Sequence, residues 1–550
     1  MTYKMPLESF SNAVQKYSSS KYLHQPIDQS LKTWTWSEVD QQARSIANAL
    51  IEMELGDGAR VGILSKNCAE WIIADIAIMM AGMISVPVYP SANQDTISYV
   101  MNNSGCQAIF VGNLDGYKEA DAGIVPEIKR ILFPYPSELR KSEKREIFEW
   151  EQLLKTKPLT ELPSQSPDST MSIVYTSGST GDPKGVVLSF NNFASAAQEA
   201  VNISGFSDND RILSYLPLAH ITERGLIELT SFYSGSKLFF TEGLESFLRD
   251  LKVASPSFFI SVPRLWNKFQ SGVLAKMPDK KLQFLLKIPV INKIISAKIR
   301  KGLGFDTARI YGSGSAPISP AILHWFNRLS IEISEGWGMT ETVGLCCTNL
   351  PFSKEAIGTI GKPMKSVEMK LGENNEIMIR GNAVFEKYYN NPVETEKSFT
   401  DGWFHTGDMG SISMSGDYSI IGRVKEQFKS AKGKYVTPAP IESLLGRNTD
   451  IEQVCVIGAG RKQPIALVVM SPQTKEETEE TSLQLLETLE QCNTKLESHQ
   501  RLDHIIVLKD DWTIENDLLT PTLKIKRAVI ENKFEHLLHE KLANKIVWKN

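Results

Sequence analysis

A loop rich in glycine, serine and threonine follows an apolar, strand-like run in the first half of the chain. The segment IVYTSGSTGDPKGVVLS places small, hydroxylated and charged residues from Thr176 to Gly185 directly after that run. Small residues let several backbone N–H groups approach phosphate oxygens, and Lys184 adds a positive charge. This composition favours a nucleotide polyphosphate site over a merely flexible connection. The residues expected to contact the nucleotide are Thr176, Ser177, Gly178, Ser179, Thr180, Gly181 and Lys184.

The loop differs from the common P-loop of nucleotide triphosphatases. That motif requires four residues between two glycines and a lysine directly after the second, followed by serine or threonine. Here Gly178 and Gly181 are three positions apart, and Lys184 comes before Gly185. The mechanics of standard NTPases are therefore not expected.

Five further segments combine small residues with side chains that can do chemistry. Glycines in the second would let a flat ring approach the backbone, and Glu341 in the third supplies an oxygen ligand suited to a hard cation. A histidine alone is more often structural, so His220 gains interest only from its flanking pattern. The segments are LPLAHITER at Leu216–Arg224, YGSGSAPIS at Tyr311–Ser319, EGWGMTET at Glu335–Thr342, DGWFHTGDMG at Asp401–Gly410 followed by GRVKEQF from Gly422, and LLTPTLKIKR at Leu518–Arg527.

In this order, the loop and the five segments resemble the adenylate-forming superfamily. That superfamily contains acyl-CoA synthetases, luciferase-like enzymes and the adenylation domains of nonribosomal peptide synthetases. The resemblance covers nearly the whole chain. It implies that a carboxylic acid reacts with ATP to give an acyl adenylate, and that the acyl group then passes to a thiol. The implied small molecules are ATP, Mg²⁺ and coenzyme A.

The resemblance also implies which residues bind the nucleotide. Trp337, at a position where tyrosine is more frequent, would stack on adenine, because an indole keeps the flat surface. Asp408 would accept hydrogen bonds from the ribose hydroxyls, and Arg423 would contact ribose or phosphates. The residues expected around the adenine are Gly314, Ser315, Ala316, Pro317, Glu335, Gly336, Trp337 and Gly338.

A second group of implied roles concerns catalysis. Lys524 would bridge carboxylate and α-phosphate oxygens and stabilise the charge that develops there. Thr340 would lie near the same atoms, Glu341 would bind magnesium, and Lys184 would favour departure of pyrophosphate. His220 would flank the carboxylate and the route of the thiol, and Lys425 would be the hinge of a mobile C-terminal domain.

Two further segments indicate which class of carboxylic acid is the substrate. SVPRLWNKF at Ser261–Phe269 and the segment Lys298–Ser319 resemble the long-chain fatty acyl branch. Long-chain acyl-CoA formation is therefore the first hypothesis. The alternatives are an acyl-AMP ligase that loads the phosphopantetheine of a carrier protein, and a CoA ligase for a medium-chain or aryl acid. From a different class, an inactive nucleotide-binding regulator is disfavoured because all the charged residues of the motifs are retained.

The elements that must position these residues alternate along the chain. Short β-branched runs between helical patterns predict an α/β fold with largely parallel sheets. With 550 residues, the chain exceeds what one core usually serves. We expect a large multi-subdomain N-terminal domain with mixed or parallel sheets over residues 1–423 and a small mobile α/β domain over 424–550. The predicted strands are Arg60–Ser65, Ile84–Tyr89, Gln107–Val111, Ser172–Thr176 and Ser257–Val262.

The composition indicates which partners and which cellular location to expect. With 60 basic and 64 acidic side chains, the formal charge of −4 gives no general attraction for nucleic acid, and no stable protein partner can be inferred. Six scattered cysteines without metal-ligand spacing fit a reducing compartment, and the N-terminus lacks a secretory pattern, so a cytoplasmic location is expected. The stretch Trp71–Pro90 is read as a buried helix and a strand. Residues Leu285–Lys301 fit a membrane-surface helix and an ordinary core-packed helix equally well.

Overall fold

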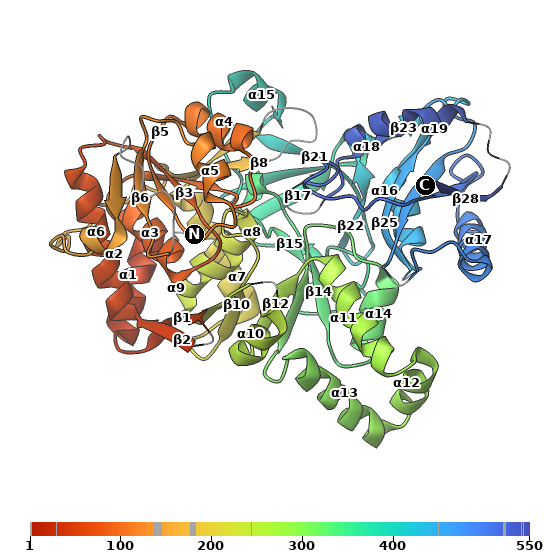
Figure 1. Ribbon diagram of the computed structural model, residues 1–550, viewed down its shortest axis with the longest axis horizontal. Coiled ribbons are helices and arrows are strands. Elements are labelled where there is room, and N and C mark those ends of the chain that lie inside the picture. Colours follow the sequence, from red (N-terminus) through yellow and green to blue (C-terminus); the bar gives the residue numbers. More distant parts are fainter. Residues whose placement is uncertain are drawn as a thin grey trace.

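The computed structural model of the protein describes residues 3–28, 30–135, 146–176, 183–243, 245–448, 450–472, 474–520, 524–540, 542 and 544–549. Its described strands form five sheets, and helices cover the larger ones (Figure 1). The predicted fold class is confirmed: a large N-terminal α/β part is followed by a smaller α/β part, which lies at one end of the molecule in Figure 1.

The first large sheet has eight strands in the order β19-β9-β8-β4-β3-β5-β6-β7. β3, β4, β5, β6 and β7 run parallel, whereas β8 and β9 form an antiparallel hairpin. Four of the five predicted strands are found here, since their β-branched residues pack between helices. The strands are β3 Arg60–Leu64, β4 Ile84–Val88, β5 Cys106–Val111, β6 Lys129–Leu132, β7 Ile147–Glu149, β8 Thr170–Thr176, β9 Lys184–Ser189 and β19 Lys387–Tyr388.

The second large sheet has nine strands in the order β16-β15-β14-β13-β12-β10-β11-β1-β2. Its centre, from β11 to β14, is parallel, and it contains the fifth predicted strand as β12. The carboxyl ends of β13 and β14 lead into the two glycine-rich segments. The strands are β1 Lys21–Ile27, β2 Ser30–Thr35, β10 Arg211–Ser214, β11 Lys237–Phe240, β12 Phe258–Ser261, β13 Ile310–Ser313, β14 Ile333–Trp337, β15 Cys347–Thr348 and β16 Lys362–Pro363.

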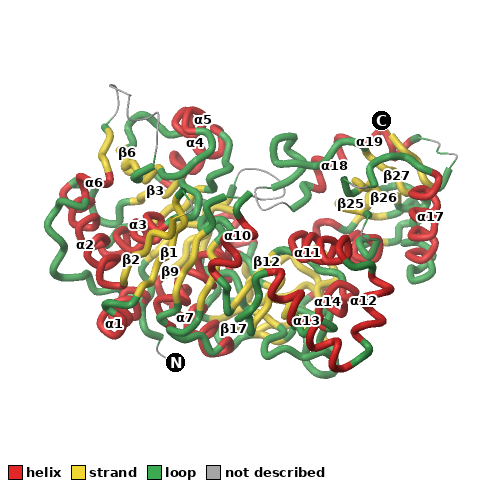
Figure 2. The backbone as a smooth tube through the Cα atoms, turned by 60° about the horizontal axis from the view of Figure 1, so that its bottom comes forward, coloured by secondary structure: helices red, strands yellow, loops and turns green. Residues whose placement is uncertain are grey.

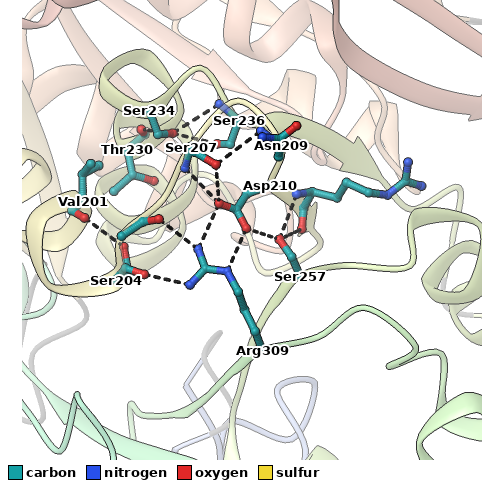
Figure 3. A network of polar contacts seen from close by, with 12 residues as sticks. Val201, Ser204, Ser207, Asn209, Asp210, Thr230, Ser234, Ser236, Ser257 and Arg309 are labelled. Atoms are coloured by element: carbon teal, nitrogen blue, oxygen red, sulfur yellow. Dashed lines mark hydrogen bonds and ion pairs between the residues drawn. The ribbon is translucent and has the colours of Figure 1, made fainter.

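A polar network fastens the amino ends of the central strands (Figure 3). Asp210, just before β10, accepts hydrogen bonds from the Ser257 hydroxyl at 2.6 Å and from both Nε and Nη2 of Arg309 at 3.1 and 2.9 Å. Burial would raise the pKa of Asp210, but the Arg309, Ser257 and Ser207 hydrogen bonds outweigh it, so the pKa is lowered. These contacts fix the amino ends of β10, β12 and β13 relative to one another, and this also positions the carboxyl ends of the same strands.

Helices pack on both large sheets and on one another. The predicted buried helix followed by a strand in Trp71–Pro90 is confirmed as α3 and β4, and every residue of α3 is buried. Among the described residues, no helix is long and apolar enough to cross a membrane. The helices up to residue 327 are α1 Pro6–Tyr17, α2 Trp36–Glu52, α3 Ala69–Met80, α4 Gln94–Ser104, α5 Tyr117–Gly123, α6 Trp150–Leu153, α7 Phe190–Ser204, α8 Ile221–Glu223, the π-helix η2 Arg224–Leu229, α9 Thr230–Ser234, α10 Phe247–Ala254, α11 Pro263–Lys276, α12 Asp279–Leu286, α13 Pro289–Leu303 and α14 Pro320–Asn327.

A five-stranded antiparallel sheet links the large part to the C-terminal part. β21 and β22 are its long hairpin, and the chain leaves β22 through the short helix η5. The elements between residues 340 and 426 that have not yet been given are η3 Thr340–Thr342, β17 Val367–Leu371, η4 Glu373–Asn375, β18 Glu376–Gly381, α15 Pro392–Lys397, β20 Phe399–Thr400, β21 Trp403–Ile412, β22 Tyr418–Arg423 and η5 Val424–Glu426.

The C-terminal part has a four-stranded sheet, β25-β26-β27-β28, and a two-stranded ribbon, β23-β24 (Figure 2). All residues of β26 and β27 are buried, so this part has a hydrophobic core of its own. Its elements are β23 Phe428–Lys429, β24 Tyr435–Val436, α16 Pro438–Leu445, β25 Ile451–Ile457, β26 Ile465–Met470, α17 Glu479–Asn493, β27 Ile505–Leu508, α18 Arg527–Lys533, α19 Glu535–His539 and β28 Ile546–Lys549.

Candidate active site

The β8-β9 hairpin frames the predicted phosphate loop. Thr176 ends β8 and pairs across the hairpin with Lys184, the first residue of β9. The Lys184 ammonium forms an ion pair with Glu394 of α15 and lies 5.3 Å from the centre of the Tyr388 ring. Side chains from a distant part of the chain thus hold the lysine beside the loop. The loop residues Ser177, Gly178, Ser179, Thr180 and Gly181 lie outside the described residues.

Glu341, the predicted magnesium ligand, contacts the same tyrosine, Tyr388, that lies beside Lys184. Its side chain is buried, and its Oε1 accepts a hydrogen bond from the Tyr388 hydroxyl at 2.8 Å. Burial raises the pKa of Glu341, while the Tyr388 hydrogen bond and the charges of Arg423 and Lys184 oppose that rise. Thr340 precedes it in the short helix η3 and is half-buried.

Asp408 and Arg423, the predicted ribose contacts, face each other across the β21-β22 hairpin. Arg423 Nε lies 2.8 Å from Asp408 Oδ1, and Trp337 donates its Nε1–H to Asp408 Oδ2 at 2.9 Å. The charge of Asp408 holds the pKa of Arg423 above its usual value. Each carboxylate oxygen has a second lone pair, so a buried Asp408 can still accept hydroxyl groups.

The glycine-rich segments after β13 and within β14 are in direct backbone contact. A Cβ atom on Gly338 would lie 1.3 Å from the carbonyl oxygen of Gly344, and one on Gly314 would lie 3.1 Å from that of Gly336. Ser315, which follows Gly314 and precedes Ala316-Pro317, adopts a left-handed φ of 67°. No larger residue fits at Gly338, because the backbone at Gly344 occupies the space that a side chain would need.

Lys524 reaches this cluster from the C-terminal part. The turn that bears it is closed on Thr520, whose N–H donates to the Lys524 carbonyl at 2.8 Å and whose hydroxyl accepts the Lys524 N–H at 3.1 Å. The Lys524 side chain keeps a substantial surface exposed to solvent. Loss of surrounding water lowers the pKa of Lys524, and the Arg423 charge lowers it further, whereas Asp408 and Glu341 oppose this.

His220 directly precedes the short helix α8. Its Nδ1 accepts the N–H of Thr222 at 3.2 Å, so the side chain caps the helix. Burial, together with the charge of Lys524, lowers the pKa of His220 to about 4. At neutral pH the ring is therefore uncharged, and because Nδ1 is an acceptor, the proton resides on Nε2.

Buried polar groups hold the segment that carries His220. Asn67 donates to the Leu216 carbonyl at 2.7 Å and accepts the Leu218 N–H at 3.0 Å. Beyond α8, the π-helix places Arg224 in the core, where Nη2 lies 2.8 Å from both carboxylate oxygens of Asp75. π-Helical turns frequently occur at functional sites. Here the extra residue per turn accompanies a fully buried ion pair behind the site.

Two family models match consecutive parts of the chain. The sequence model described as "AMP-binding enzyme" matches residues 10–389, and the one for the "AMP-binding enzyme C-terminal domain" matches residues 425–544. The chain belongs to the AMP-binding enzyme family. It is a family of ligases, and ATP, Mg²⁺ and coenzyme A are confirmed as the small molecules that its adenylate-forming CoA ligases use.

The chain also resembles curated proteins over most of its length. It is 30% identical to a long-chain-fatty-acid–CoA ligase, FadD15, of Mycobacterium bovis, over 91% of this chain and 90% of that protein. It is 30% identical to long-chain-fatty-acid–CoA ligase 5 of Mus musculus, over 92% and 84%. Long chain acyl-CoA synthetase 1 of Arabidopsis thaliana is 29% identical over 98% and 93%. The expected placement of this AMP-binding enzyme in the long-chain branch is confirmed.

Solved structures share its fold. The anthranilate CoA ligase AuaEII in complex with anthranoyl-AMP superimposes with a TM-score of 0.81 at 20% identity, covering 98% of both chains. The o-succinylbenzoate CoA synthetase of Bacillus subtilis in complex with ATP and magnesium gives 0.73 at 21% identity, covering 96% of this chain and 99% of that one.

The geometry also reveals contacts that the motifs did not predict. Tyr388 and Glu394 hold Glu341 and Lys184, and Arg527 of α18 pairs with Glu442 at 2.8 Å and with Glu426 of η5 at 3.4 Å. Glu426 directly follows the predicted hinge residue Lys425, so the hinge is tied to the C-terminal part. The signal for Tyr388 was an aromatic pair before a proline-started helix, which is weak in isolation.

Proposed function

We propose that this AMP-binding enzyme converts a long-chain fatty acid, ATP and coenzyme A into acyl-CoA, AMP and pyrophosphate. The observation that carries the proposal is that Trp337 and Arg423 contact the carboxylate of Asp408 at 2.9 and 2.8 Å, and that the charges of Asp408 and Arg423 act on Lys524. The names of the curated relatives support the choice of acid and acceptor.

In the first half-reaction, a carboxylate oxygen of the acid attacks the α-phosphorus of ATP, and the bond to the β-phosphate oxygen breaks. Lys524 and Thr340 orient the reacting oxygens, and Lys184 draws the departing pyrophosphate away. Asp408 and Arg423 hold the ribose, and Trp337 covers the adenine. A lysine whose pKa is lowered still donates when protonated, and it contributes most when water is excluded.

Magnesium fits this site as a companion of the nucleotide. Within the described residues, no group of three or more histidine, cysteine, aspartate or glutamate side chains is arranged to hold a metal. Mg²⁺ usually takes one or two carboxylates together with substrate phosphates. Glu341 supplies one carboxylate, with Tyr388 orienting it, and the ion would neutralise charge on the phosphates.

In the second half-reaction, the coenzyme A thiol attacks the acyl carbonyl of the adenylate, the acyl–phosphate bond breaks, and AMP and a proton leave. Rotation about Lys425 would withdraw Lys524 and open the path of the thiol. His220 stays with the large part. Its neutral ring presents Nε2–H, so it acts as a hydrogen-bond donor to the acyl group and does not act as a base.

The proposal is tested by acid-dependent pyrophosphate release with and without coenzyme A, across fatty acids of increasing length and aryl acids, with the product identified by mass. We expect release to rise with chain length and acyl-CoA to form. Accumulation of adenylate without thioester would instead support a ligase for a carrier protein. Absence of turnover with every acid would support a nucleotide-binding regulator. Contact with a membrane surface, where a fatty acid partitions, is part of the same proposal.

A further inference from the structure

The helices α12 and α13 form a hairpin at an outer edge of the molecule in both views (Figures 1 and 2). Among the described residues, four large hydrophobic side chains within eleven positions of this hairpin face solvent. They are Phe284, Ile288, Val290 and Ile294, with 67%, 39%, 70% and 62% of their surfaces exposed. Large apolar patches on a protein surface mark sites of interaction with another molecule or a membrane.

These side chains are not needed to hold the hairpin in place. Leu282 and Leu286 of α12 are buried, and Ile295, Ile299 and Leu303 of α13 pack against the second hydrophobic core cluster. Val290 and Ile294 are four residues apart, so they lie on one face of α13, away from that packed face. One apolar side of the hairpin therefore packs against the rest of the protein, and the other apolar side is exposed and can contact another molecule.

The charge around the exposed face is strongly positive. Residues 279–301 contain seven basic side chains and one acidic one, a net charge of +6 in a chain whose total is −4. All six lysines of this stretch are exposed, and none pairs with an acidic group among the described residues. The carboxylate of Asp279 is occupied, since it accepts hydrogen bonds from Trp325 and Gln283. The lysines are Lys280, Lys281, Lys287, Lys293, Lys298 and Lys301.

We propose that the α12-α13 hairpin docks this enzyme onto an anionic lipid bilayer, with Phe284, Val290 and Ile294 entering the acyl boundary and the lysines meeting the headgroups. Apolar side chains surrounded by lysines on one helix face are the composition of a helix that lies in a membrane interface. A second copy is a poorer partner, because a two-fold interface would set one basic face against another. Nucleic acid would leave the apolar side chains in water.

The inference deepens the proposed function and rests on it, since the acid that this enzyme would use partitions into lipid. A hairpin at the surface would keep the large part beside that lipid while the C-terminal part moves. Neither α12 nor α13 contributes any of the site residues described above, so docking and catalysis can be measured separately.

The first experiment measures binding of the full-length enzyme to sedimented vesicles of phosphatidylcholine, with and without phosphatidylglycerol. We expect binding only to the anionic vesicles, with loss at high salt. The variant F284S/V290S/I294S should lose that binding. The matched control L31S/I51S/L483S, which changes exposed hydrophobic residues on β2, α2 and α17, should bind as the native enzyme does.

A second variant guards against a folding defect in the first. K287Q/K293Q/K298Q changes only exposed lysines, and each removed charge is expected to weaken binding about fivefold at low salt. Its matched control is K155Q/K157Q/K495Q, exposed lysines elsewhere. Equal vesicle binding by the hairpin and control variants would overturn the proposal, as would a native enzyme that ignores anionic vesicles or one whose hairpin mediates only self-association.

Pyrophosphate release with a short, water-soluble acid separates this proposal from the proposed function. All docking variants should keep native turnover with that acid and lose turnover only with a long-chain acid presented in anionic vesicles. Vesicle binding by an enzyme without any acid-dependent turnover would retain the docking surface and reject the activity. Turnover without vesicle binding would do the reverse.

Discussion

The indole of Trp337 combines a flat surface with a hydrogen bond that a phenyl ring cannot make. Its Nε1–H donates to Asp408 at 2.9 Å, and Asp408 is otherwise held by Arg423 alone among charged side chains. A hydrogen bond to a charged group contributes about 1.5–3 kcal/mol. The predicted stacking on adenine would require an aromatic residue here, and the contact with Asp408 is one that tryptophan makes through its Nε1–H.

We predict that W337F binds ATP about tenfold more weakly, because stacking survives while Asp408 loses one of its two partners. The measurement is the ATP dependence of pyrophosphate release, supported by direct AMP binding. W548F is the matched control, since it removes a tryptophan hydrogen bond to Ser482 at 3.0 Å outside the site. Unchanged nucleotide affinity in W337F would show that the bond to Asp408 plays no part in binding.

At Lys524, we predict that K524Q slows adenylate formation about a hundredfold or more, because it removes a charge aimed at the developing anion. Thioester formation from supplied acyl adenylate should be retained, since Lys524 serves only the first half-reaction. K526Q is the control: Lys526 is two residues away and pairs with Asp517. A similar loss in both variants, or loss of both half-reactions in K524Q, would move the catalytic assignment away from Lys524.

The lowered pKa of Lys524 gives this residue a signature in pH dependence. The protonated form is the active one, so kcat/KM for adenylation should fall as pH rises through the pKa of Lys524, below the usual range of a lysine. K524R, whose guanidinium stays protonated, should lose this alkaline limb even if its rate is low. An identical limb in K524R would assign the titration to another group.

At the scale of elements, the short helix η5 connects β22 to the C-terminal part. Proline at Lys425 would fix φ and remove an N–H in the segment that must change conformation. We expect K425P to form adenylate at nearly the native rate and to stop thioester formation, as judged by separate assays of the half-reactions. K425A removes the charge without stiffening the backbone and should retain both steps. Equal loss of both half-reactions in K425P would argue against a hinge here.

The helical segment behind His220 rests on a fully buried ion pair. Asp75 of α3 meets Arg224 at the start of the π-helix, and Glu228 lies 3.8 Å from Arg224 with its two oxygens otherwise unpaired. Burial, then the charge of Asp75, raises the pKa of Glu228 well above its usual value. Removing Asp75 would take away both short carboxylate contacts of Arg224 and leave only Glu228, 3.8 Å away, beside its guanidinium.

We predict that D75A lowers the free energy of unfolding of the large part by about 3 kcal/mol, the usual cost of an unpaired buried charge. Urea unfolding followed by tryptophan fluorescence would measure this. D40A is the matched control, because it breaks an ion pair with Arg44 at 2.8 Å near the surface of α2. That pair should contribute about 0.5 kcal/mol. Equal losses in the two variants would mean that burial does not govern the Asp75 pair.

At the scale of the whole molecule, the site is complete only when the C-terminal part is seated on the large part. Arg264, at the start of α11, forms an ion pair with Glu452 of β25 across that junction. Arg264 is about half exposed, so the pair should be worth no more than about 1 kcal/mol. A weak contact of this kind would suit the proposed movement of the two parts between half-reactions.

We therefore predict that R264E slows adenylation by about fivefold at most and leaves thermal stability unchanged, while the exchanged pair R264E/E452R restores the rate. The rate of pyrophosphate release and the melting temperature are the two readouts. Failure of the exchanged pair to recover activity would show that Arg264 acts through some other contact.

Much of this could be predicted from the sequence because the signals are local. β-Branched runs predicted β3, β4, β5, β8 and β12 within one or two residues at each end. The order of the motifs predicted the family, which the comparisons confirmed. The roles of individual residues, and the boundary after Arg423, stay predictions.

Only the tertiary structure determined which side chains contact one another. Tyr388 with Glu341, Trp337 with Asp408, and Lys184 with Glu394 are 47, 71 and 210 residues apart, and their meeting depends on strand order in three sheets. The α12-α13 hairpin was ambiguous in the sequence for a similar reason. Apolar residues occur all around its helices, and periodicity cannot tell a face that packs on a core from one left open. Which face of each helix stays exposed depends on which face the rest of the chain packs against.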